Sequence, residues 1–339
     1  MNGATRVLRF LATVPVVVIS LCIPARGQQS SCTPVSVEAN VILPDGRLIR
    51  GLQRDGLVAE SKAGSVHIES VTRDIGPRRI LFVLDGGRDL SRDAIKAQTE
   101  IVSYIVQGAN TPDTFAFTVA RGNHATVRFD EGRENLLAAL PRLEDSANSP
   151  SDNEGSLDAV MEAVDWFGAA QPGDAVVLMS LDIEKNKHAT YPQIARILSD
   201  RHIRLFGLAL GPINVGTVYS EIGGDYRGRP IAHSDVVFND QTLSGLSWNS
   251  GGYLLVENTK MPWKEYKLTD ARLEELKNEA SQLYGVISEF YRVAIVPPPH
   301  AKEHEYWKLD LSESLRKRVP QAKVLYPRDL PPCLPAVAR

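Results

Sequence analysis

The chain has 339 residues, of which 43% are hydrophobic, so it is long enough for one large domain or two modest ones around a substantial core. Its formal net charge is only −3, and its lysines and arginines are scattered along the chain. No basic stripe is interleaved with aromatic residues, and this argues against nucleic acid as a partner.

The first 27 residues have the composition of an export signal. Arg6 and Arg9 precede an apolar run of roughly 14 residues, and a polar segment with small residues follows. A helix that spans a bilayer needs about 20 apolar residues, so this run is short for a membrane anchor. We predict a signal peptide over residues 1–27, a secreted or periplasmic protein, and no transmembrane segment once the signal is cleaved. The alternative is an uncleaved segment that anchors the chain.

Export changes the interpretation of the cysteines. Cys22 leaves with the signal peptide, and the mature chain keeps Cys32 near its start and Cys333 near its end. In an oxidising compartment an even pair predicts a disulfide between the two ends. Two free thiols are the alternative.

Residues 35–75 are predicted to form short β-strands, because β-length apolar pieces alternate there with glycine-containing turns. From residue 78 to residue 257, fully apolar strands alternate with amphipathic helices. The strands include "RILFVLD", "DAVVLMSLDI" and "IRLFGLALG". This alternation predicts a doubly wound, mostly parallel sheet with helices on both faces, whose ligands bind outside the carboxyl ends of the strands.

Residues 265–327 are predicted to form a long amphipathic helix, which begins after Asp270, and further β-strands. The tail, residues 328–339, is rich in proline, and we expect it to be unpaired.

Four pieces in this order resemble the exported von Willebrand factor type A-related proteins, a group first described in acidobacteria. The pieces are "VSVEANVILPDGRLIRGL" at 35–52, the strand that ends in Asp85, "LSGLSWNSGGY" at 243–253 and "VISEFYRVAIVPP" at 286–298. The resemblance implies an A-type, Rossmann-like α/β domain with flanking N- and C-terminal β segments. It also implies binding of protein partners through a divalent cation.

The family's metal site uses D-x-S-x-S after the first strand, and this chain departs from that pattern. Asp85 is retained, Gly87 has no side chain to replace the first serine, and Asp89 stands in place of the second. The first strand therefore keeps carboxylates that suit Mg²⁺ or Ca²⁺ but loses a hydroxyl ligand.

The other two ligand positions have changed as well. The threonine of the family corresponds to Glu154 or, if the loop is shorter, to Ser156, and the aspartate after the fourth strand corresponds to Leu181 beside Asp182. We therefore predict a degenerate metal-dependent adhesion site that needs no cofactor, with Mg²⁺ or Ca²⁺ as the alternative. The metal candidates are Asp85, Asp89, Glu154 and Asp182; the ligand-binding rim is Asp85, Asp89, Ser156 and Asp182.

Two further stretches could carry function. "HAKEH", His300 to His304, has the spacing of a zinc motif, but prolines precede it, and we expect a loop rather than the helix that zinc binding needs. Residues 211–241 form a long polar connection, which is predicted to be either a partner-binding loop or a solvated one.

Together these features predict an exported, non-catalytic protein-binding or adhesion module, with a protein or a surface polymer as its partner. No residue pattern supplies a catalytic set, because neither a nucleophile elbow nor a dinucleotide-binding glycine motif is present. The alternatives are a metal-assisted envelope hydrolase and a structural component of an envelope assembly.

Overall fold

The computed structural model describes most of the chain. The described residues are 32–86, 90–120, 125–145, 155–179, 186–210, 243–257, 265–302 and 304–333. The predicted signal peptide and the 211–241 connection lie outside them. Within these ranges, no helix combines the length and the apolar character needed to cross a membrane.

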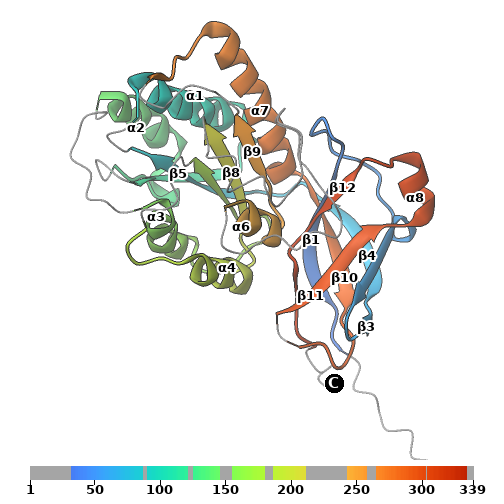
Figure 1. Cartoon of the computed structure of the whole chain (residues 1–339). Helices are drawn as coiled ribbons and strands as arrows, with labels where there is room; N and C mark the ends of the chain where they lie inside the picture. The colour runs from blue at the N-terminus through green and yellow to red at the C-terminus, as the bar shows by residue number, and fades with distance from the viewer. Residues whose placement is uncertain are drawn as a thin grey trace, which may run out of the picture.

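A parallel five-stranded sheet forms the centre of the larger unit (Figure 1). Its strand order is β6-β5-β7-β8-β9, an order typical of doubly wound folds in which the first strand lies between the second and the third. The strands are β5 (Arg79–Asp85), β6 (Thr114–Ala120), β7 (Ala175–Met179), β8 (Arg204–Leu210) and β9 (Leu254–Glu257). Val127 adds an antiparallel bridge to Phe117 at the β6 edge.

Helices cover both faces of this sheet because successive residues of its apolar strands point to opposite sides. In β5, Ile80, Phe82 and Leu84 pack on one side, and Leu81 and Val83 on the other. The first side carries α1 (Arg92–Gly108), α2 (Arg133–Asp145) and α7 (Asp270–Ser288); the second carries α3 (Ser156–Ala163), its 3-10 extension η3 (Val164–Phe167), α4 (Tyr191–Asp200) and α6 (Leu243–Asn249).

Several helices start at the capping residues that the sequence supplies. The side chains of Ser91 and Thr269 accept hydrogen bonds from the N–H groups of Ala94 and Arg272 at the starts of α1 and α7. Thr190 and Gln193 form a capping box at the start of α4. The sheet and these seven helical segments, residues 79–288, are called the α/β domain below.

The second unit is built from both ends of the chain. Two antiparallel four-stranded sheets, β12-β1-β10-β4 and β13-β11-β2-β3, enclose one apolar cluster that includes Val293 and Trp307. The strands are β1 (Val35–Ile42), β2 (Leu57–Ser61), β3 (Gly64–Ser65), β4 (His67–Asp74), β10 (Phe290–Val296), β11 (Glu305–Leu311), β12 (Lys323–Leu325) and β13 (Asp329–Leu330), with the short helices η1 (Arg54–Gly56) and α8 (Glu313–Arg318). This unit, residues 32–74 and 290–333, is called the β-sandwich.

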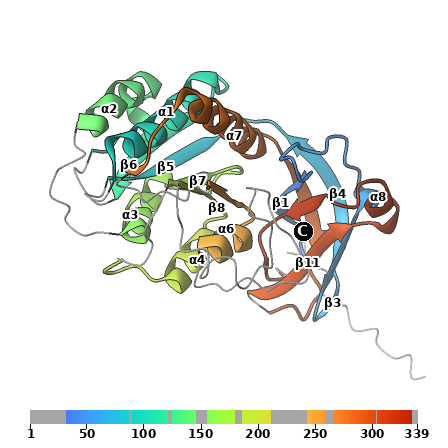
Figure 2. The ribbon, with the colours of Figure 1, turned by 45° about the horizontal axis from the view of Figure 1, so that its top comes forward.

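The register of the β-sandwich shows how far apart in sequence its partners are. Val37 of β1 pairs with Val293 of β10, and Ala59 of β2 pairs with Leu309 of β11. The α/β domain is therefore an insertion between two halves of the β-sandwich, and Figure 2 shows the two units side by side.

The disulfide predicted between the chain ends is present, with Cys32 and Cys333 at a Cα–Cα distance of 5.1 Å. The expectation of an unpaired tail is wrong for its described part. Asp329 and Leu330 pair with Tyr306 and Glu305 of β11, and Leu330 is buried. The prolines flank this short edge strand without interrupting it, which is where a sheet tolerates them.

The predicted fold class, a doubly wound and mostly parallel sheet with flanking β segments, is confirmed by these sheets. All five strands of the central sheet are parallel, so their carboxyl ends meet at one edge, called the carboxyl edge, and their amino ends at the opposite one, the amino edge.

Candidate functional site

Asp85 ends β5 at the carboxyl edge and is buried, with 1% of its surface exposed. Gln98 of α1 fixes its backbone, because the Asp85 N–H donates to Gln98 Oε1 at 2.8 Å and Gln98 Nε2 donates to the Asp85 carbonyl at 3.0 Å. The Gly86 N–H continues the strand by donating to the Ala120 carbonyl. The end of β5 is thus held by α1 and β6, whatever its carboxylate binds.

A small cavity of about 10 Å³ lies beside Asp85, lined mainly by Ile95, Gln98, Val119 and Leu143. Such a volume holds one water molecule at most. The described residues around this cavity therefore leave no room there for a larger ligand.

Asp158 organises the next part of the edge. Its carboxylate accepts hydrogen bonds from the N–H groups of Gly155 (3.1 Å), Lys187 (2.7 Å), His188 (2.9 Å) and Ala189 (2.6 Å). Burial alone raises the pKa of this carboxyl group, but the four donors outweigh burial and hold the pKa below its usual value. The start of α3 and the segment before α4 are therefore tied together by one negative charge.

Asn186 makes the same connection from the other side. Its Oδ1 accepts a hydrogen bond from the Leu157 N–H at 2.8 Å. A Cβ atom at Gly155 would collide with the Asn186 side chain, so this close approach requires glycine. Ser156, the first residue of α3, is fully buried at this contact.

Of the residues predicted to form the rim, the structure describes Asp85 and Ser156, and both are buried. The rim residues Asp89 and Asp182 and the metal candidate Glu154 lie outside the described residues, and their roles stay predictions. Sequence reasoning missed the roles of Gln98 and Asp158. Asp158 is the third residue of α3 and accepts from the Gly155 N–H, as the acidic residue of a capping box does, although Gly155 has no side chain to complete the box. That position could have identified the aspartate, whereas nothing in the sequence indicates the partner of Gln98.

The predicted cation can be compared with the donors available. Mg²⁺ and Ca²⁺ take six or more oxygen ligands, of which waters supply some. Within the described ranges, no group of three acidic, histidine or cysteine side chains could hold a metal ion, and Asp85 is the described carboxylate of the predicted set. The described donors alone are too few to define such a site.

The segment from His300 to His304 is a loop between β10 and β11, as expected, and its described residues include no helix. His304 adopts a positive φ of 57°, and its Nδ1 lies 3.2 Å from Asp329 Oδ2. The imidazole therefore faces the tail strand β13, and the zinc interpretation loses the helical context it needs.

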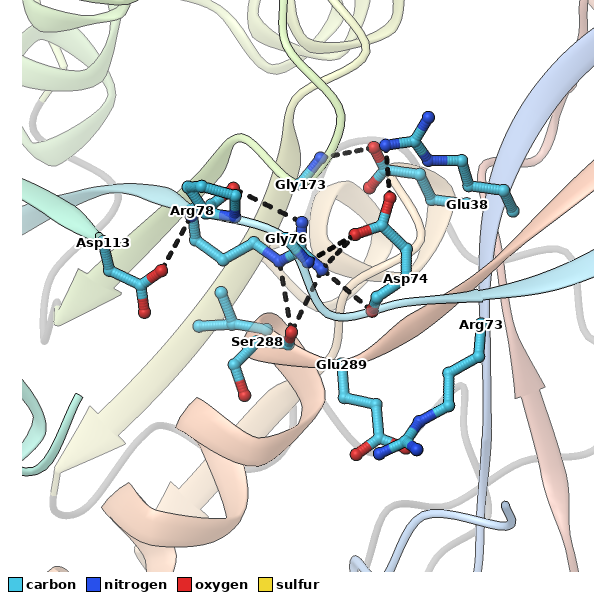
Figure 3. Close-up of polar contacts among 12 residues, drawn as sticks. Glu38, Arg73, Asp74, Gly76, Arg78, Asp113, Gly173, Ser288 and Glu289 are labelled. Atoms are coloured by element: carbon cyan, nitrogen blue, oxygen red, sulfur yellow. Dashed lines mark hydrogen bonds and ion pairs between the residues drawn. The ribbon is translucent and has the colours of Figure 1, made fainter. Parts of the chain in front are cut away.

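The amino edge of the parallel sheet carries a second polar group of residues, where the β-sandwich joins the α/β domain (Figure 3). Arg78, just before β5, is buried and donates to Asp74 Oδ1 at 2.7 Å and to the Ser288 carbonyl at 3.1 Å. Its guanidinium also lies 4.3 Å from the ring centre of Phe290. One side chain thus connects β4, β5 and the end of α7.

Gly173 allows another segment to approach this arginine. Its φ is +87°, and a Cβ there would lie 2.6 Å from Arg78 Cδ. Its N–H donates to Glu38 Oε1 of β1 at 2.6 Å, which joins the turn before β7 to the β-sandwich (Figure 3). Only glycine satisfies both the backbone conformation and the contact.

Glu38 and Arg204 form an ion pair at the same junction, with Arg204 buried and the Glu38 side chain 11% exposed. Arg204 Nε lies 2.9 Å from Glu38 Oε2, but the two atoms lack hydrogen-bond geometry, so we treat this contact as coulombic. Arg204 Nη1 donates to Asn40 Oδ1 at 2.6 Å. Burial raises the pKa of the Glu38 carboxyl group, although Arg204 and the Gly173 N–H both favour the charged form.

With this geometry established, the chain can be placed among known proteins. No family model matches it, and no curated protein sequence matches it either. Several solved structures are similar to it in fold, with identities of 10–13%: proximal thread matrix protein 1 from the mussel byssus, BatB from Bacteroides thetaiotaomicron, and a von Willebrand factor type A protein from Catenulispora acidiphila.

The extents of these matches differ. The byssus protein matches 66% of this chain and 50% of its own length with a TM-score of 0.44. BatB matches 62% of this chain and 100% of its own length, and the Catenulispora protein 76% and 52%, both with a TM-score of 0.37. The chain thus spans about half the length of two of these proteins. At such identities the similarity concerns the fold, and function has to be argued from the site.

Proposed function

We propose that the protein is an exported, non-catalytic binding module that recognises a protein or a surface polymer with the carboxyl edge of its parallel sheet. The observation that carries this proposal is the position of the β-sandwich. Glu38 and Asp74 of the β-sandwich meet Arg204 and Arg78 at the amino edge. The opposite edge, where ligands bind in open α/β sheets, is left for recognition.

The rigid framework of the carboxyl edge supports the same function. Asp158 and Asn186 hold the start of α3 against the segment before α4, and Gln98 holds the end of β5. A binding surface loses less conformational entropy when its supports are fixed before the partner arrives. Asp89 and Asp182, two of the sequence-predicted rim residues, follow β5 and β7 in the chain.

Export is supported by the Cys32–Cys333 disulfide, since such bonds persist in oxidising compartments. The signal peptide over residues 1–27 remains a prediction from composition.

A non-catalytic role is supported by Ser156, whose hydroxyl is buried at the start of α3 where a nucleophile would need to meet substrate.

A charge-reversal experiment tests the proposal. The disulfide-bonded mature protein is immobilised, and retention of components from the producing organism's envelope extract is measured for a rim variant, Asp89→Lys with Asp182→Lys. The matched control, Glu60→Lys with Glu69→Lys, makes the same charge change on exposed positions of the β-sandwich. We expect the rim variant to lose retention at least tenfold and the control to keep it. Loss in the control alone would select the structural role instead.

The degenerate metal site is tested separately by calorimetry of the wild-type protein with Mg²⁺, Ca²⁺ and Mn²⁺. We expect no binding heat, and partner retention that is unchanged by a chelator. Saturable binding that Asp182→Asn abolishes would contradict the degenerate site. Turnover of an envelope substrate that the same variant abolishes would favour the metal-assisted hydrolase.

A further inference from the structure

A cavity of about 300 Å³ lies where the α/β domain meets the β-sandwich, far from the predicted rim in the fold. Trp248 of α6 contributes one wall. The other walls come from β11, α8, β12 and the segment before β13, and their charged side chains are Lys308, Asp310, Arg316, Lys323 and Arg328. This volume is at the lower end of the range for small-ligand sites, which often occur between domains.

The charges around this cavity are unbalanced. Four cationic side chains face it, and Asp310 is the one carboxylate among its lining residues. The negative charge of Asp310 is divided between two of these cations, because Asp310 forms an ion pair with Arg316 and its Oδ2 lies 3.8 Å from Lys308 Nζ. Among the described residues, Lys323 and Arg328 form no ion pair with a carboxylate, and Arg328 feels Asp310 only as a nearby charge. Within the described part of the chain, the cationic side chains that line the cavity therefore outnumber its carboxylates.

Arg328 is held in place without being neutralised. Its guanidinium lies 5.1 Å from the Trp248 ring centre and 4.2 Å from that of Tyr326, so both aromatic rings orient it. Its Nε is buried and makes no hydrogen bond with the described part of the protein. A buried donor without an acceptor costs free energy, so Arg328 is held by the two rings and by the Tyr326 hydroxyl rather than by a full set of hydrogen bonds.

Lys323 is similarly short of a partner. It is half-buried in β12, and its ammonium group forms neither a hydrogen bond nor an ion pair with the described residues. Burial lowers the pKa of this group to about 8, so it remains mostly protonated at neutral pH although its surroundings oppose the charge. A bound anion would stabilise this charge.

We infer that this junction cavity binds a phosphate-class oxyanion that carries at least two negative charges. Its donors come from three different segments, namely Arg316 of α8, Lys323 of β12 and Arg328 before β13. A tetrahedral phosphate offers acceptor oxygens in several directions, whereas a planar carboxylate offers two in one plane. Guanidinium groups match phosphate oxygens with paired N–H donors, and an ammonium adds a compact charge.

Such a ligand would couple the two units of the molecule. Arg328 contacts both units. Its backbone N–H donates to the Asn249 carbonyl at the end of α6, and its guanidinium lies over the ring of Tyr326 in the β-sandwich. An anion held by Arg328 and Lys323 therefore binds the folded junction and not the separated units, and it stabilises the native state by mass action. This site is independent of the carboxyl-edge function proposed above.

Calorimetry and thermal unfolding of the full mature chain at pH 7 test the site, with inorganic pyrophosphate, inorganic phosphate, glucose 6-phosphate and tricarballylate as probes. We expect pyrophosphate to bind and to raise Tm. Lys323→Met should weaken binding at least tenfold and remove the Tm shift. Its matched control, Lys317→Met, removes the same charge from an exposed position on α8 that pairs with Glu313 and should bind like wild type.

The outcomes separate the alternatives. Glucose 6-phosphate that binds as well as pyrophosphate would identify an ester-borne phosphate as the source of the anion, and pyrophosphate alone would identify a free one. Tighter binding of tricarballylate would overturn the phosphate class. If wild type and Lys323→Met bind equally, and ligand-free Tm values show that both are folded, the site is overturned. It is also overturned if no probe binds.

Discussion

The two edges of the parallel sheet fix their polar groups by different means. At the carboxyl edge, Asp158 is satisfied by backbone N–H groups, all within 31 residues of it in sequence. At the amino edge, charged side chains also contact one another and backbone groups across much longer separations, such as the 164 residues between Asn40 and Arg204. The first arrangement stiffens loops of one domain, and the second joins two domains.

This difference matters for function. A recognition edge built on backbone donors keeps its shape while its exposed side chains vary, because the supports do not depend on them. The amino edge depends on charged side chains that are buried, and loss of one partner leaves the other without compensation. We therefore expect substitutions at the amino edge to affect stability and substitutions at the rim to affect binding.

The largest effect is expected from removal of the disulfide. Replacing Cys32 and Cys333 by serine frees a loop with a sequence separation of 301 residues. In the chain-entropy model this lowers the free energy of unfolding by about 5 kcal/mol. Because the bond joins the two ends of the β-sandwich, hydrogen exchange should accelerate in β1 and β13 before it does in β5 and β7. Equal acceleration in all four strands would show that the two units unfold together.

Arg204→Met is expected to have the next largest effect. It leaves the Glu38 carboxylate buried without its cation, and breaking a buried ion pair in this way costs about 4 kcal/mol. Urea unfolding measures the loss. The double variant with Glu38→Gln should recover most of it, since the amide oxygen that replaces the carboxylate can still accept from the Gly173 N–H. If the double variant is no more stable than Arg204→Met, the two side chains do not act as a pair.

Asp158→Asn perturbs the carboxyl edge and should cost about 2–3 kcal/mol, because an amide has one acceptor oxygen where the carboxylate uses two. The folded pKa of Asp158 lies below its unfolded value of 3.8. Its contribution is therefore complete above pH 3.8 and is lost as the pH falls through the folded pKa. Urea unfolding from about pH 7 to about pH 2 should show the wild type converging on the variant. A constant difference across this range would exclude the charge as the cause.

Much of the α/β domain could be predicted from sequence because its signals are local. Fully apolar strands such as β5 indicate burial on both faces, and Ser91 and Thr269 mark helix starts. The β-sandwich was harder, because its two halves are separated by the whole α/β domain. Nothing near Val37 indicates that Val293 is its partner. The tail was mispredicted because prolines beside a two-residue edge strand look like those of an unpaired segment.

The same difference between local and long-range signals decides which residues of the candidate site could be predicted. Asp85 was identified because a strand of the parallel sheet ends there, and Asp158 was identifiable from its place three residues after Gly155 at the start of a helix. The junction charges could not be predicted, since Glu38, Arg78 and Arg204 are ordinary surface residue types in sequence. Only the tertiary fold buries them together.

The smallest effect is expected at the junction cavity, where pH changes the charge of Lys323. Its pKa is about 8 in the folded protein and 10.5 when unfolded, so the unfolded chain binds more protons between these values. The stability of the wild type should therefore rise with pH in this window relative to Lys323→Met. The variant should be more stable at pH 7 by about 1–2 kcal/mol, discounted for solvent screening of a half-buried group.

Urea unfolding of both proteins at intervals from about pH 7 to pH 10.5 measures this difference. The other titratable groups are common to both proteins and cancel in the comparison. The groups that face Lys323 are Lys308, Asp310, Arg316 and Arg328, and only Asp310 among them is negative. A variant less stable than wild type at pH 7 would mean that Asp310 neutralises Lys323 after all. The cavity would then lack the uncompensated charge that sets the amino side of the molecule apart from its carboxyl edge.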